Sequence, residues 1–366
     1  MIYRAGATLL VVMSATIAQP ADEAVSRETL RQWGFDALAR IVADLQGPYS
    51  PHYADEARLD GYRAGPAFNW GVGVMITALT AATHHEPLTA ARLEAFGNAV
   101  EVYWNPEGPV PGYDVLPVPK PVDRYYDDNQ WLVLGFLEAY ELTANPAWLD
   151  RARRALVYSL SGEDETLGGG IWWRENPRDG KNTCSNAPAV VACYRFAEVT
   201  GETEWLARGN AILDWTLANL QDPADGLMWD GMNANGEINE RKWTYNTALT
   251  LRALADVSRD AASLQRAVEM GRAALAHWQD AETGALKDDA QFAHLLTDAL
   301  LYVDSRTGTG EFRPAVLRAL TYLHDHGRDE LGHYSGRWEA QADGRWSKWQ
   351  LIHMASAVRG YLQAAK

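Results

Sequence analysis

The feature that most constrains the fold is an alternation, repeated six times along the chain, between two kinds of helical segment. One kind carries an apolar stripe at helical spacing, as Leu30, Trp33 and Leu38 do. The other kind is apolar on nearly every face, as in residues 131–142. An amphipathic helix covers a core, whereas a helix that is apolar all round is itself buried. The chain therefore needs six amphipathic helices that cover six buried ones.

The positions of the segments follow from this periodicity. Amphipathic helices are expected near 26–46, 87–104, 146–160, 203–220, 262–279 and 311–326. Buried helices are expected near 68–82, 128–143, 185–200, 245–259, 290–304 and 348–364. An amide residue opens each buried segment, at Asn69, Asn129, Asn186, Asn246, Gln291 and Gln350, which indicates an internal repeat. The expected fold class is all-α: an (α/α)6 barrel if the hairpins close into a ring, or an open solenoid if they do not.

The connections that lead into the buried helices are long and rich in glycine and aromatic residues, whereas the other connections are short. All the long connections must lie on one face of the structure, which is where function is expected. Asp127 and Asp128 stand on this face, at the start of the second buried helix. Hydrolysis of a glycosidic bond needs two carboxyl groups, and neighbouring aromatic residues offer flat surfaces for a sugar ring.

An adjacent pair of aspartates can also be no more than a helix start, because Asp caps the free N–H groups there. A second pair, Asp288 and Asp289, precedes the fifth buried helix and shows how readily this layout produces such pairs. The first pair differs in its polar and aromatic frame, which includes Tyr126 and Asn129.

Three segments in order resemble those of glycoside hydrolase family 76. They are Tyr-Asp-Asp-Asn-Gln-Trp at 126–131, Gly-Gly-Gly-Ile-Trp-Trp at 168–173 and Lys-Asn-Thr-Cys-Ser-Asn at 181–186. Together with the six hairpins, the resemblance covers nearly all of the chain after its N-terminal segment. The family contains bacterial endo-α-1,6-mannanases and fungal cell-wall mannosyl transglycosidases. The resemblance implies an (α/α)6 barrel, retaining hydrolysis of an α-1,6-mannan or a related neutral α-linked glycan, and no metal or organic cofactor.

The resemblance also implies roles for residues. Asp127 would be the nucleophile and Asp128 the general acid and base. The implied substrate-binding residues are Tyr126, Asn129, Trp172, Trp173, Asn182, Ser185, Asn186, Asp230, Tyr245 and Asn246. Some have structural alternatives, because Ser185 or Asn186 could cap a helix, Asp230 could belong to a turn and one of the two tryptophans could be core.

Several alternative functions remain open on the sequence alone. A transglycosidase would use the same covalent intermediate with a sugar hydroxyl in place of water. An unsaturated glucuronyl hydrolase would need basic residues for a uronate, for which Arg124, Arg174 and Lys181 are available. A sugar 2-epimerase would use histidines such as His294 and His353. A catalytically inactive glycan-binding barrel is a fourth possibility.

Composition narrows the range of partners. The chain has 15 Trp and 16 Tyr, which suits an aromatic cleft for a polysaccharide or oligosaccharide. A net charge of -15 argues against nucleic acid and against an anionic membrane surface. The two cysteines, Cys184 and Cys193, would lie about 13 Å apart along one helix, so they are expected to be free, buried thiols that serve packing. No cluster of residues has the spacing of metal ligands.

The N-terminus has the pattern of a signal peptide. Arg4 is followed by an uncharged stretch from Ala5 to Ala18, which is too short and too polar for a convincing membrane span. We expect cleavage after residue 18, export to the periplasm or the medium, and a single catalytic domain over 19–366. We also expect a monomer without stable membrane insertion.

Overall fold

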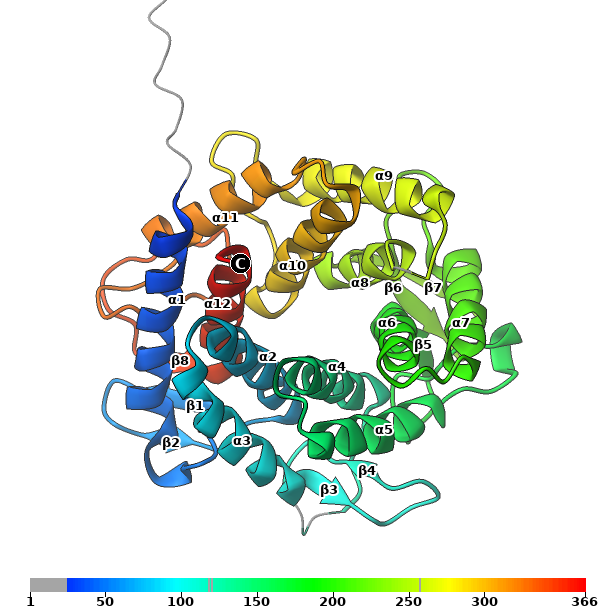
Figure 1. The fold of residues 1–366 in the computed structure, drawn as a ribbon, viewed down its shortest axis with the longest axis horizontal. Helices are drawn as coiled ribbons and strands as arrows, with labels where there is room; N and C mark the ends of the chain where they lie inside the picture. Colours follow the sequence, from blue (N-terminus) through cyan, green and yellow to red (C-terminus); the bar gives the residue numbers. More distant parts are fainter. Residues whose placement is uncertain (1–24, 118, 120, 257) are drawn as a thin grey trace, which may run out of the picture.

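The computed structural model describes residues 25–117, 119, 121–256 and 258–366, so the expected signal segment lies outside the described residues. The described chain forms two concentric rings of helices, which Figure 1 shows end-on. The outer ring contains α1 (Arg27–Ile41), α3 (Ala90–Ala99), α5 (Pro146–Leu160), α7 (Glu204–Leu220), α9 (Ala261–Trp278) and α11 (Arg313–His326). The inner ring contains α2 (Asn69–His85), α4 (Tyr126–Thr143), α6 (Thr183–Thr200), α8 (Thr244–Leu254), α10 (Ala290–Thr307) and α12 (Leu351–Ala364).

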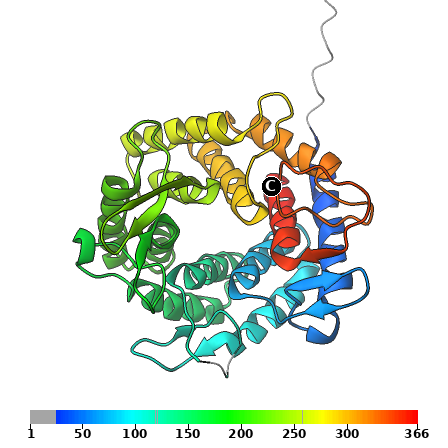
Figure 2. The same ribbon diagram turned by 180° about the vertical axis from the view of Figure 1, so that it is seen from behind.

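The inner ring is closed. Each inner helix packs against the next one along the chain, and α12 packs against α2. The outer helix α1 lies against α12, so the two ends of the helical chain meet, as the view from behind also shows (Figure 2). The fold is therefore an (α/α)6 barrel, and the open solenoid is excluded. The closed ring buries the inner helices on every side, which explains their continuous apolar sequences.

Local signals in the sequence fix several helix ends. The Ser26 hydroxyl accepts a hydrogen bond from the N–H of Thr29 at 3.0 Å and caps α1. The Asn145 side chain does the same for Ala147 at 3.0 Å, ahead of α5. The helices α6 and α10 end at Gly201 and Gly308, where φ is 75° and 70°. Glycine adopts this left-handed conformation without the steric cost of a Cβ.

Some expected boundaries differ from the observed ones. The helix α8 ends at Leu254 instead of 259, because the Asp256 carboxylate accepts hydrogen bonds from the backbone and hydroxyl of Ser258 and forms a turn. The last inner helix begins at Leu351 instead of 348, because 348–350 pair with residues 56–58 as a strand. This pairing joins segments almost 300 residues apart, so helical periodicity could not reveal it. The expected helix 87–104 begins and ends in 3₁₀ turns around α3.

Short strands organise the long loops at the face where the inner helices begin. One sheet has the order β2 (Arg63–Ala64), β1 (Glu56–Arg58), β8 (Lys348–Gln350). A second pairs β3 (Trp104–Asn105) with β4 (Gly112–Tyr113). The third has the order β5 (Gly180–Asn182), β6 (Trp229–Asn233), β7 (Ile238–Lys242), with Asn182 opposite Gly231. The loop face is therefore an ordered wall around the barrel mouth.

The fourth residue of an inner helix ties this wall to the barrel. In α4, Asn129 accepts a hydrogen bond from the N–H of Tyr113 and donates one to its carbonyl, both at 2.8 Å. In α6, Asn186 binds Ile171 in the same way, at 2.7 and 3.0 Å. In α8 the Thr247 hydroxyl accepts a hydrogen bond from the backbone N–H of Met228, and in α12 the Met354 sulfur accepts one from the backbone N–H of Tyr334. An asparagine side chain is suited to this position because it binds both the donor and the acceptor of one residue.

Replacing such a clamp should destabilise the protein. Asn186→Leu has a similar volume but leaves the buried N–H and C=O of Ile171 without partners, so we expect a loss of about 3 kcal/mol. Chemical denaturation measures this change. The matched control is Asn235→Ala in the exposed turn after β6, which should leave the midpoint unchanged. Equal midpoints for Asn186→Leu and the wild type would contradict the clamp.

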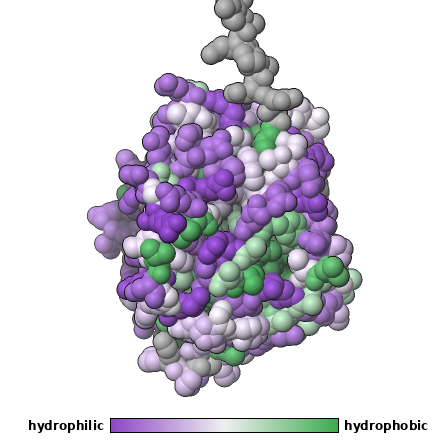
Figure 3. Space-filling view, turned by 90° about the vertical axis from the view of Figure 1, so that its left-hand side faces the viewer, coloured by the Kyte–Doolittle hydropathy of each residue, from purple (hydrophilic) through white to green (hydrophobic). Residues whose placement is uncertain are grey.

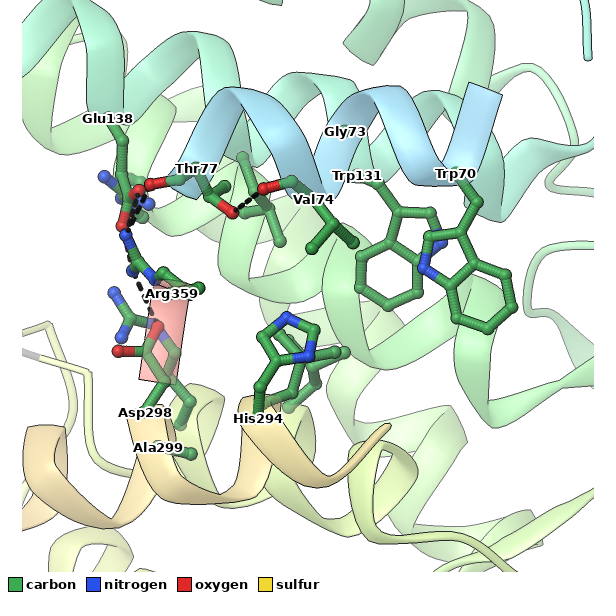
Figure 4. Close-up of a pocket in the computed structure, with 15 residues that line it drawn as sticks. Trp70, Gly73, Val74, Thr77, Trp131, Glu138, His294, Asp298, Ala299 and Arg359 are labelled. Atoms are coloured by element: carbon green, nitrogen blue, oxygen red, sulfur yellow. Dashed lines mark hydrogen bonds and ion pairs between the residues drawn. The ribbon is translucent and has the colours of Figure 1, made fainter. Parts of the chain in front are cut away.

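The barrel axis is not fully packed. A cavity of about 60 Å³ lies between the inner helices, and Figure 4 shows its lining. Trp70 and Trp131 lie side by side at one end of the view, and Arg359 meets Glu138 and Asp298 at the other. The outer surface shown in Figure 3 is mainly hydrophilic, with hydrophobic residues in limited areas, in keeping with the large negative charge of the chain.

Candidate active site

The second residues of the six inner helices surround the barrel mouth. They occupy equivalent helical positions and are Trp70, Asp127, Cys184, Tyr245, Gln291 and Ile352. Three of them carry a buried polar atom without a hydrogen-bond partner in the described residues: Trp70 Nε1, Asp127 Oδ1 and Gln291 Oε1. Because buried polar groups are normally satisfied, a concentration of free ones at one end of a barrel indicates a site for a polar ligand.

Asp127 and Asp128 lie in the first turn of α4 but do not cap it. The N-cap residue is Tyr125, and no side chain caps the helix there. The Asp128 side chain is buried, with 5% of the residue exposed, and Asp127 is half-buried. The positive end of the helix dipole stabilises negative charge at this place. The pair is therefore available for chemistry.

Burial raises the pKa of both carboxyl groups. It raises the pKa of Asp127 to about 7, although the Cys184 thiol, the Trp173 indole and backbone N–H groups favour the ionised form. It raises the pKa of Asp128 well above the ordinary value, and the negative charges of Asp127 and Asp123 raise it further. Two close carboxyl groups of this kind share one proton, and Asp128 is the group that holds it.

The loop between α5 and α6 brings Trp173 to the pair. The Trp173 carbonyl accepts a hydrogen bond from the N–H of Tyr126 at 3.0 Å, which docks the loop on the start of α4. The Trp173 indole N–H donates to Asp127 Oδ2 at 3.2 Å. The ring of Trp173 is half-buried and packs edge-on against Tyr125. It forms a wall of the mouth beside the first carboxylate.

Three more groups complete the polar part of the mouth. The Cys184 thiol and the Tyr245 hydroxyl are neighbours, and burial raises the pKa of each well above its ordinary value, helped by the negative charge of Asp127. Asp230, on β6, accepts a hydrogen bond from Asn239 at 2.8 Å, and burial raises its pKa as well. The structure thus brings Asp127, Tyr245 and Asp230 together, as the sequence predicts, and adds Cys184, which was expected to serve packing alone.

Four aromatic rings, here called the aromatic floor, cluster beside the pair: Trp70, Tyr245 and Phe292 at the starts of their helices, and Trp131 one helical turn after Asp127. Trp70 and Trp131 are nearly parallel, with ring centroids 6.1 Å apart. Tyr245 stacks on Phe292 at 4.3 Å, and Phe292 lies 5.5 Å from Trp70. Trp70 and Trp131 also line the axial cavity. Such a surface can carry the apolar face of a sugar ring while the polar groups above it bind hydroxyls.

Four residues predicted to bind substrate have other tasks. Asn129 and Asn186 are the loop clamps described above, and both are 0% exposed. Tyr126 is 1% exposed and stacks on Tyr158, with ring centroids 5.1 Å apart. Trp172 donates from its indole N–H to Asp164 at 2.7 Å and is buried in the core. These side chains position the site from behind and are closed to a substrate.

The remaining predicted residues lie at or near the mouth. Asn182 is half-exposed on β5, next to Gly231. Ser185 is buried with its hydroxyl unpartnered, and the Gln130 side chain donates to its carbonyl at 2.6 Å. Asn246 is buried beside Asp230, whose carboxylate it helps to keep ionised, and its amide has no strong partner in the described chain. Of these three, Asn182 has an accessible side chain, whereas Ser185 and Asn246 are 0% exposed and lie behind the surface of the mouth.

The second aspartate pair is fully occupied. Asp288 accepts hydrogen bonds from the N–H and hydroxyl of Thr244, at 2.7 and 2.8 Å, and from the N–H of Asp289 at 2.8 Å. Asp289 precedes α10 and forms an ion pair with Arg337. This pair joins α8 to the loop before α10 and is not free to react.

The basic residues considered for a uronate are also occupied. Arg124 is buried and pairs with Glu175, Arg174 pairs with Asp179, and Lys181 pairs with Asp164. The Lys181 ammonium donates to the Asp164 carboxylate and to the backbone carbonyls of Asp164, Thr166 and Gly169, so it fixes that loop. His294 lines the axial cavity, and its Nδ1 donates a hydrogen bond to the carbonyl of Ala290 at 3.1 Å.

Sequence reasoning missed Trp70, Gln291 and Phe292. The signal that would have found the first two is the register of the repeat, because the second residue of every inner helix faces the mouth. Phe292 could be found only from packing, since it contributes through its contact with Tyr245. Among the described residues no group of His, Cys, Asp and Glu is arranged to hold a metal ion. No helix in the described part of the chain is long and apolar enough to cross a bilayer.

Comparison with known proteins gives consistent results. The sequence profile described as glycosyl hydrolase family 76 matches residues 36–357. Among solved structures, a family 76 α-mannanase from Bacteroides thetaiotaomicron superposes with a TM-score of 0.86 at 28% identity, covering 92% of this chain and 95% of that one.

Two further matches are informative. An inactive variant of an α-1,6-mannanase from Salegentibacter sp., with two adjacent Asp residues changed to Asn and α-1,6-mannotriose bound, superposes with a TM-score of 0.78 at 19% identity, covering 92% and 99% of the two chains. A curated relative from Saccharomyces cerevisiae, mannan endo-1,6-α-mannosidase DFG5, is 27% identical over 161 residues, which are 39% of this chain and 35% of that protein. The chain spans less than half of the length of the curated relatives it matches.

Proposed function

The chain belongs to glycosyl hydrolase family 76, and we propose that it cleaves α-1,6-linked mannan by a retaining mechanism at Asp127 and Asp128. The observation that carries this proposal is the pair of adjacent carboxyl groups in the barrel mouth, whose pKa values burial raises, that of Asp128 further by the charge of Asp127. The names of two similar structures, an α-mannanase and an α-1,6-mannanase, support the choice of substrate. The neutral sugar chain also suits a mouth in which the nearby basic residues are already paired.

In the first step, an oxygen of Asp127 attacks the anomeric carbon of a mannose residue. Asp128 gives its proton to the leaving glycosidic oxygen, so the bond to the aglycone breaks as a covalent bond to Asp127 forms. The N–H of Trp173 and the dipole of α4 keep Asp127 ionised for the attack. The high pKa of Asp128 keeps it protonated until the leaving oxygen takes the proton.

In the second step, the ionised Asp128 removes a proton from water, and the hydroxide oxygen attacks the same carbon. The bond to Asp127 breaks, and both carboxyl groups return to their first protonation state. Two inversions restore the α configuration. In this proposal the half-buried Asp230 accepts hydrogen bonds from sugar hydroxyls, and the aromatic floor carries the ring.

This division of roles predicts the pH dependence. Activity needs Asp127 ionised, so the rate falls as the pH falls through the raised pKa of that group, about 7. Activity needs Asp128 protonated, so the rate falls again as the pH rises through its still higher pKa. Because the two carboxyl groups interact, the apparent pKa values of the acid and alkaline limbs of the profile describe the pair and not either residue alone. A profile of kcat/KM against pH should therefore show an optimum at neutral to alkaline pH, and an optimum near pH 4 would contradict these roles.

The substrate is tested by product analysis on unbranched α-1,6-mannan, with α-1,2-mannan, α-1,4-glucan and polyuronate in parallel. We expect short α-1,6-manno-oligosaccharides from the first polymer and no products from the polyuronate. Products longer than an added oligosaccharide substrate would identify the enzyme as a transglycosidase. If the enzyme cleaves one of the other polymers and not α-1,6-mannan, the choice of mannan is refuted, while the assignment of the carboxylate pair stands.

We also propose that the enzyme acts outside the cytoplasm as a monomer. The support is the signal-like sequence of residues 1–18 and the nature of a polymeric mannan, which does not enter cells intact. Mass spectrometry of the protein from the periplasm or medium should give an N-terminus at residue 19. Retention of Met1 in a cytoplasmic fraction would contradict export.

A further inference from the structure

We propose that Gln291 helps to select the linkage of the glycan: its side-chain amide binds the C4 hydroxyl of the mannose that Asp127 attacks. This inference rests on the proposed function and names the hydroxyl that the far wall of the same site recognises. A chain linked through C1 and C6 leaves that hydroxyl free on every unbranched residue, whereas a chain linked through C4 does not.

The register of α10 directs Gln291 into the mouth. His294 and Leu295 of this helix line the axial cavity, so they face the barrel axis. Residues three and four positions apart lie on the same face of a helix. Gln291 precedes these two residues by three and four positions, so it is the axis-facing residue one turn nearer the mouth. Asp127 holds the same place in α4, four residues before Trp131, which also lines the cavity.

Gln291 and Asp127 stand on opposite walls. In the closed inner ring two helices separate α4 from α10 on either side, so these helices are opposite members of the ring (Figure 1). Trp70 of α2 and Tyr245 of α8 are also opposite members, and their ring centroids are 6.3 Å apart, so their rings meet near the axis. A sugar ring that lies on the aromatic floor therefore has one wall at Asp127 and the opposite wall at Gln291.

The Gln291 amide is available for a ligand. Its Oε1 atom is buried and has no hydrogen-bond partner among the described residues, while the side chain as a whole is partly exposed. A buried polar atom without a partner costs free energy that a ligand can recover. The terminal torsion of a glutamine is soft, so the amide can turn towards a sugar on the aromatic floor. A hydroxyl is both donor and acceptor and suits either atom of the amide.

The chemistry of the sugar identifies which hydroxyl this is. Asp127 must reach C1, and the atom across a pyranose ring from C1 is C4. A group on the wall opposite Asp127 therefore meets the C4 edge of the ring. In an α-1,6-linked chain this edge carries a free hydroxyl. In an α-1,4-linked chain it carries the next sugar, which would press against Gln291 instead of donating a hydrogen bond.

The test combines a variant with a modified substrate. Gln291→Leu nearly keeps the volume of the side chain and removes the amide. The substrate is an aryl α-1,6-mannotrioside, and its analogue lacks the C4 hydroxyl on the sugar that bears the aryl group. We expect each single change to lower kcat/KM about 10-fold, and both together to lower it little more than either alone. Losses that multiply would overturn the proposal.

Two controls exclude a general effect of the substitution. Gln363→Leu alters another glutamine whose buried Oε1 lacks a partner in the described chain, but it lies in the last turn of α12, at the end of the barrel away from the mouth. It should leave kcat/KM unchanged. An analogue without the C3 hydroxyl should lose the same factor in the wild type and in Gln291→Leu. Coupling of the variant to C3 instead of C4 would contradict the assignment.

A structural role for Gln291 predicts a different result. The thermal midpoint of Gln291→Leu without sugar should be no lower than that of the wild type, because the variant removes an unpartnered buried oxygen. Gln291→Ala, which cannot overfill the mouth, should show the same coupling to the C4 hydroxyl. Loss of stability in both variants without that coupling would assign Gln291 to the framework and overturn the proposal.

A binding measurement separates this inference from the proposed function. If the wild type does not cleave α-1,6-mannan, the proposed function is refuted, and isothermal titration with methyl α-mannoside and its 4-deoxy analogue still tests Gln291. The wild type should bind the parent sugar about 10-fold more tightly than the analogue, and Gln291→Leu should bind both alike. Absence of that preference in the wild type, or its survival in the variant, would refute the role of Gln291.

Discussion

Asp127→Asn should reduce kcat/KM on α-1,6-mannan by roughly 10⁴-fold or more, because an amide cannot form the covalent intermediate. The loss should appear with every substrate, whatever its leaving group. Binding should survive, since the substituted side chain has the same shape and the aromatic floor and polar wall are unchanged. Isothermal titration with mannotriose measures the affinity, and reducing-end release measures the rate.

Asp128→Asn should behave differently, because the proton that Asp128 donates matters only when the leaving group is strongly basic. On mannan we expect a loss of about 10² to 10⁴-fold. An aryl manno-oligosaccharide with a weakly basic leaving group needs no proton, so its first step should remain fast. The alkaline limb of the pH profile should also disappear. Equal losses on both substrates would contradict the assignment of Asp128 as the acid.

The chain supplies its own control for these variants. Asp289→Asn alters the second aspartate pair, in which Asp289 precedes α10 and forms an ion pair with Arg337. We expect activity close to that of the wild type. Full activity in both Asp127→Asn and Asp128→Asn would remove the central carboxylate pair from the mechanism.

Arg359→Leu should have the largest effect on stability, a loss of about 3–5 kcal/mol in the free energy of unfolding. The Arg359 guanidinium donates to Glu138 at 2.7 and 2.8 Å and to Asp298 at 2.7 Å, inside the barrel (Figure 4). Leucine would leave two buried carboxylates without this partner. Chemical denaturation at pH 7 measures the loss.

The pH dependence of this loss has a definite sign. Burial alone would raise the pKa values of Glu138 and Asp298, but Arg359 holds both below their ordinary values. The pairing therefore stabilises the wild type above the unfolded pKa values and is lost as the pH falls through the folded ones. In the variant both pKa values should rise, so the deficit should be large at pH 7 and smaller near pH 4.

Two comparisons check the cause. Combining Arg359→Leu with Glu138→Gln and Asp298→Asn should recover much of the lost stability, because no buried charge is then left unpaired. Arg272→Leu removes an arginine whose ion pair with Glu311 is exposed, and it should leave the unfolding midpoint nearly unchanged. A loss independent of pH, and not recovered by the triple variant, would indicate lost packing instead of unpaired charge.

The helices could be predicted from the sequence because each shows its own helical spacing of apolar residues, which does not depend on how the barrel closes. The closure of the ring could not, since it depends on α12 meeting α2 and on strand pairing between 56–58 and 348–350. The end of α8 was missed because it is set by a turn in which the Asp256 side chain accepts a hydrogen bond from Ser258. Such a side-chain hydrogen bond does not show in the spacing of apolar residues.

The site was partly predictable. The position of Asp127 at the mouth follows from the repeat, and the same 57-residue step leads to Cys184, so that neighbour was within reach of the sequence. Asn129 and Asn186 were interpreted as sugar ligands because an amide suits either task. Their position in the helix decides between the two tasks. Each follows the residue that faces the mouth by two positions, so its side chain lies on the opposite side of the helix and points outward to the loops. Buried contacts such as those of Trp172 require the tertiary structure.

The most direct test of the mechanism is the configuration of the first product. Proton NMR of mannotetraose digestion, recorded before the reducing ends mutarotate, distinguishes the two anomers. Attack by Asp127 followed by attack of water predicts that the α anomer accumulates first and then equilibrates. Initial accumulation of the β anomer would show a single displacement by water and would contradict Asp127 as the nucleophile.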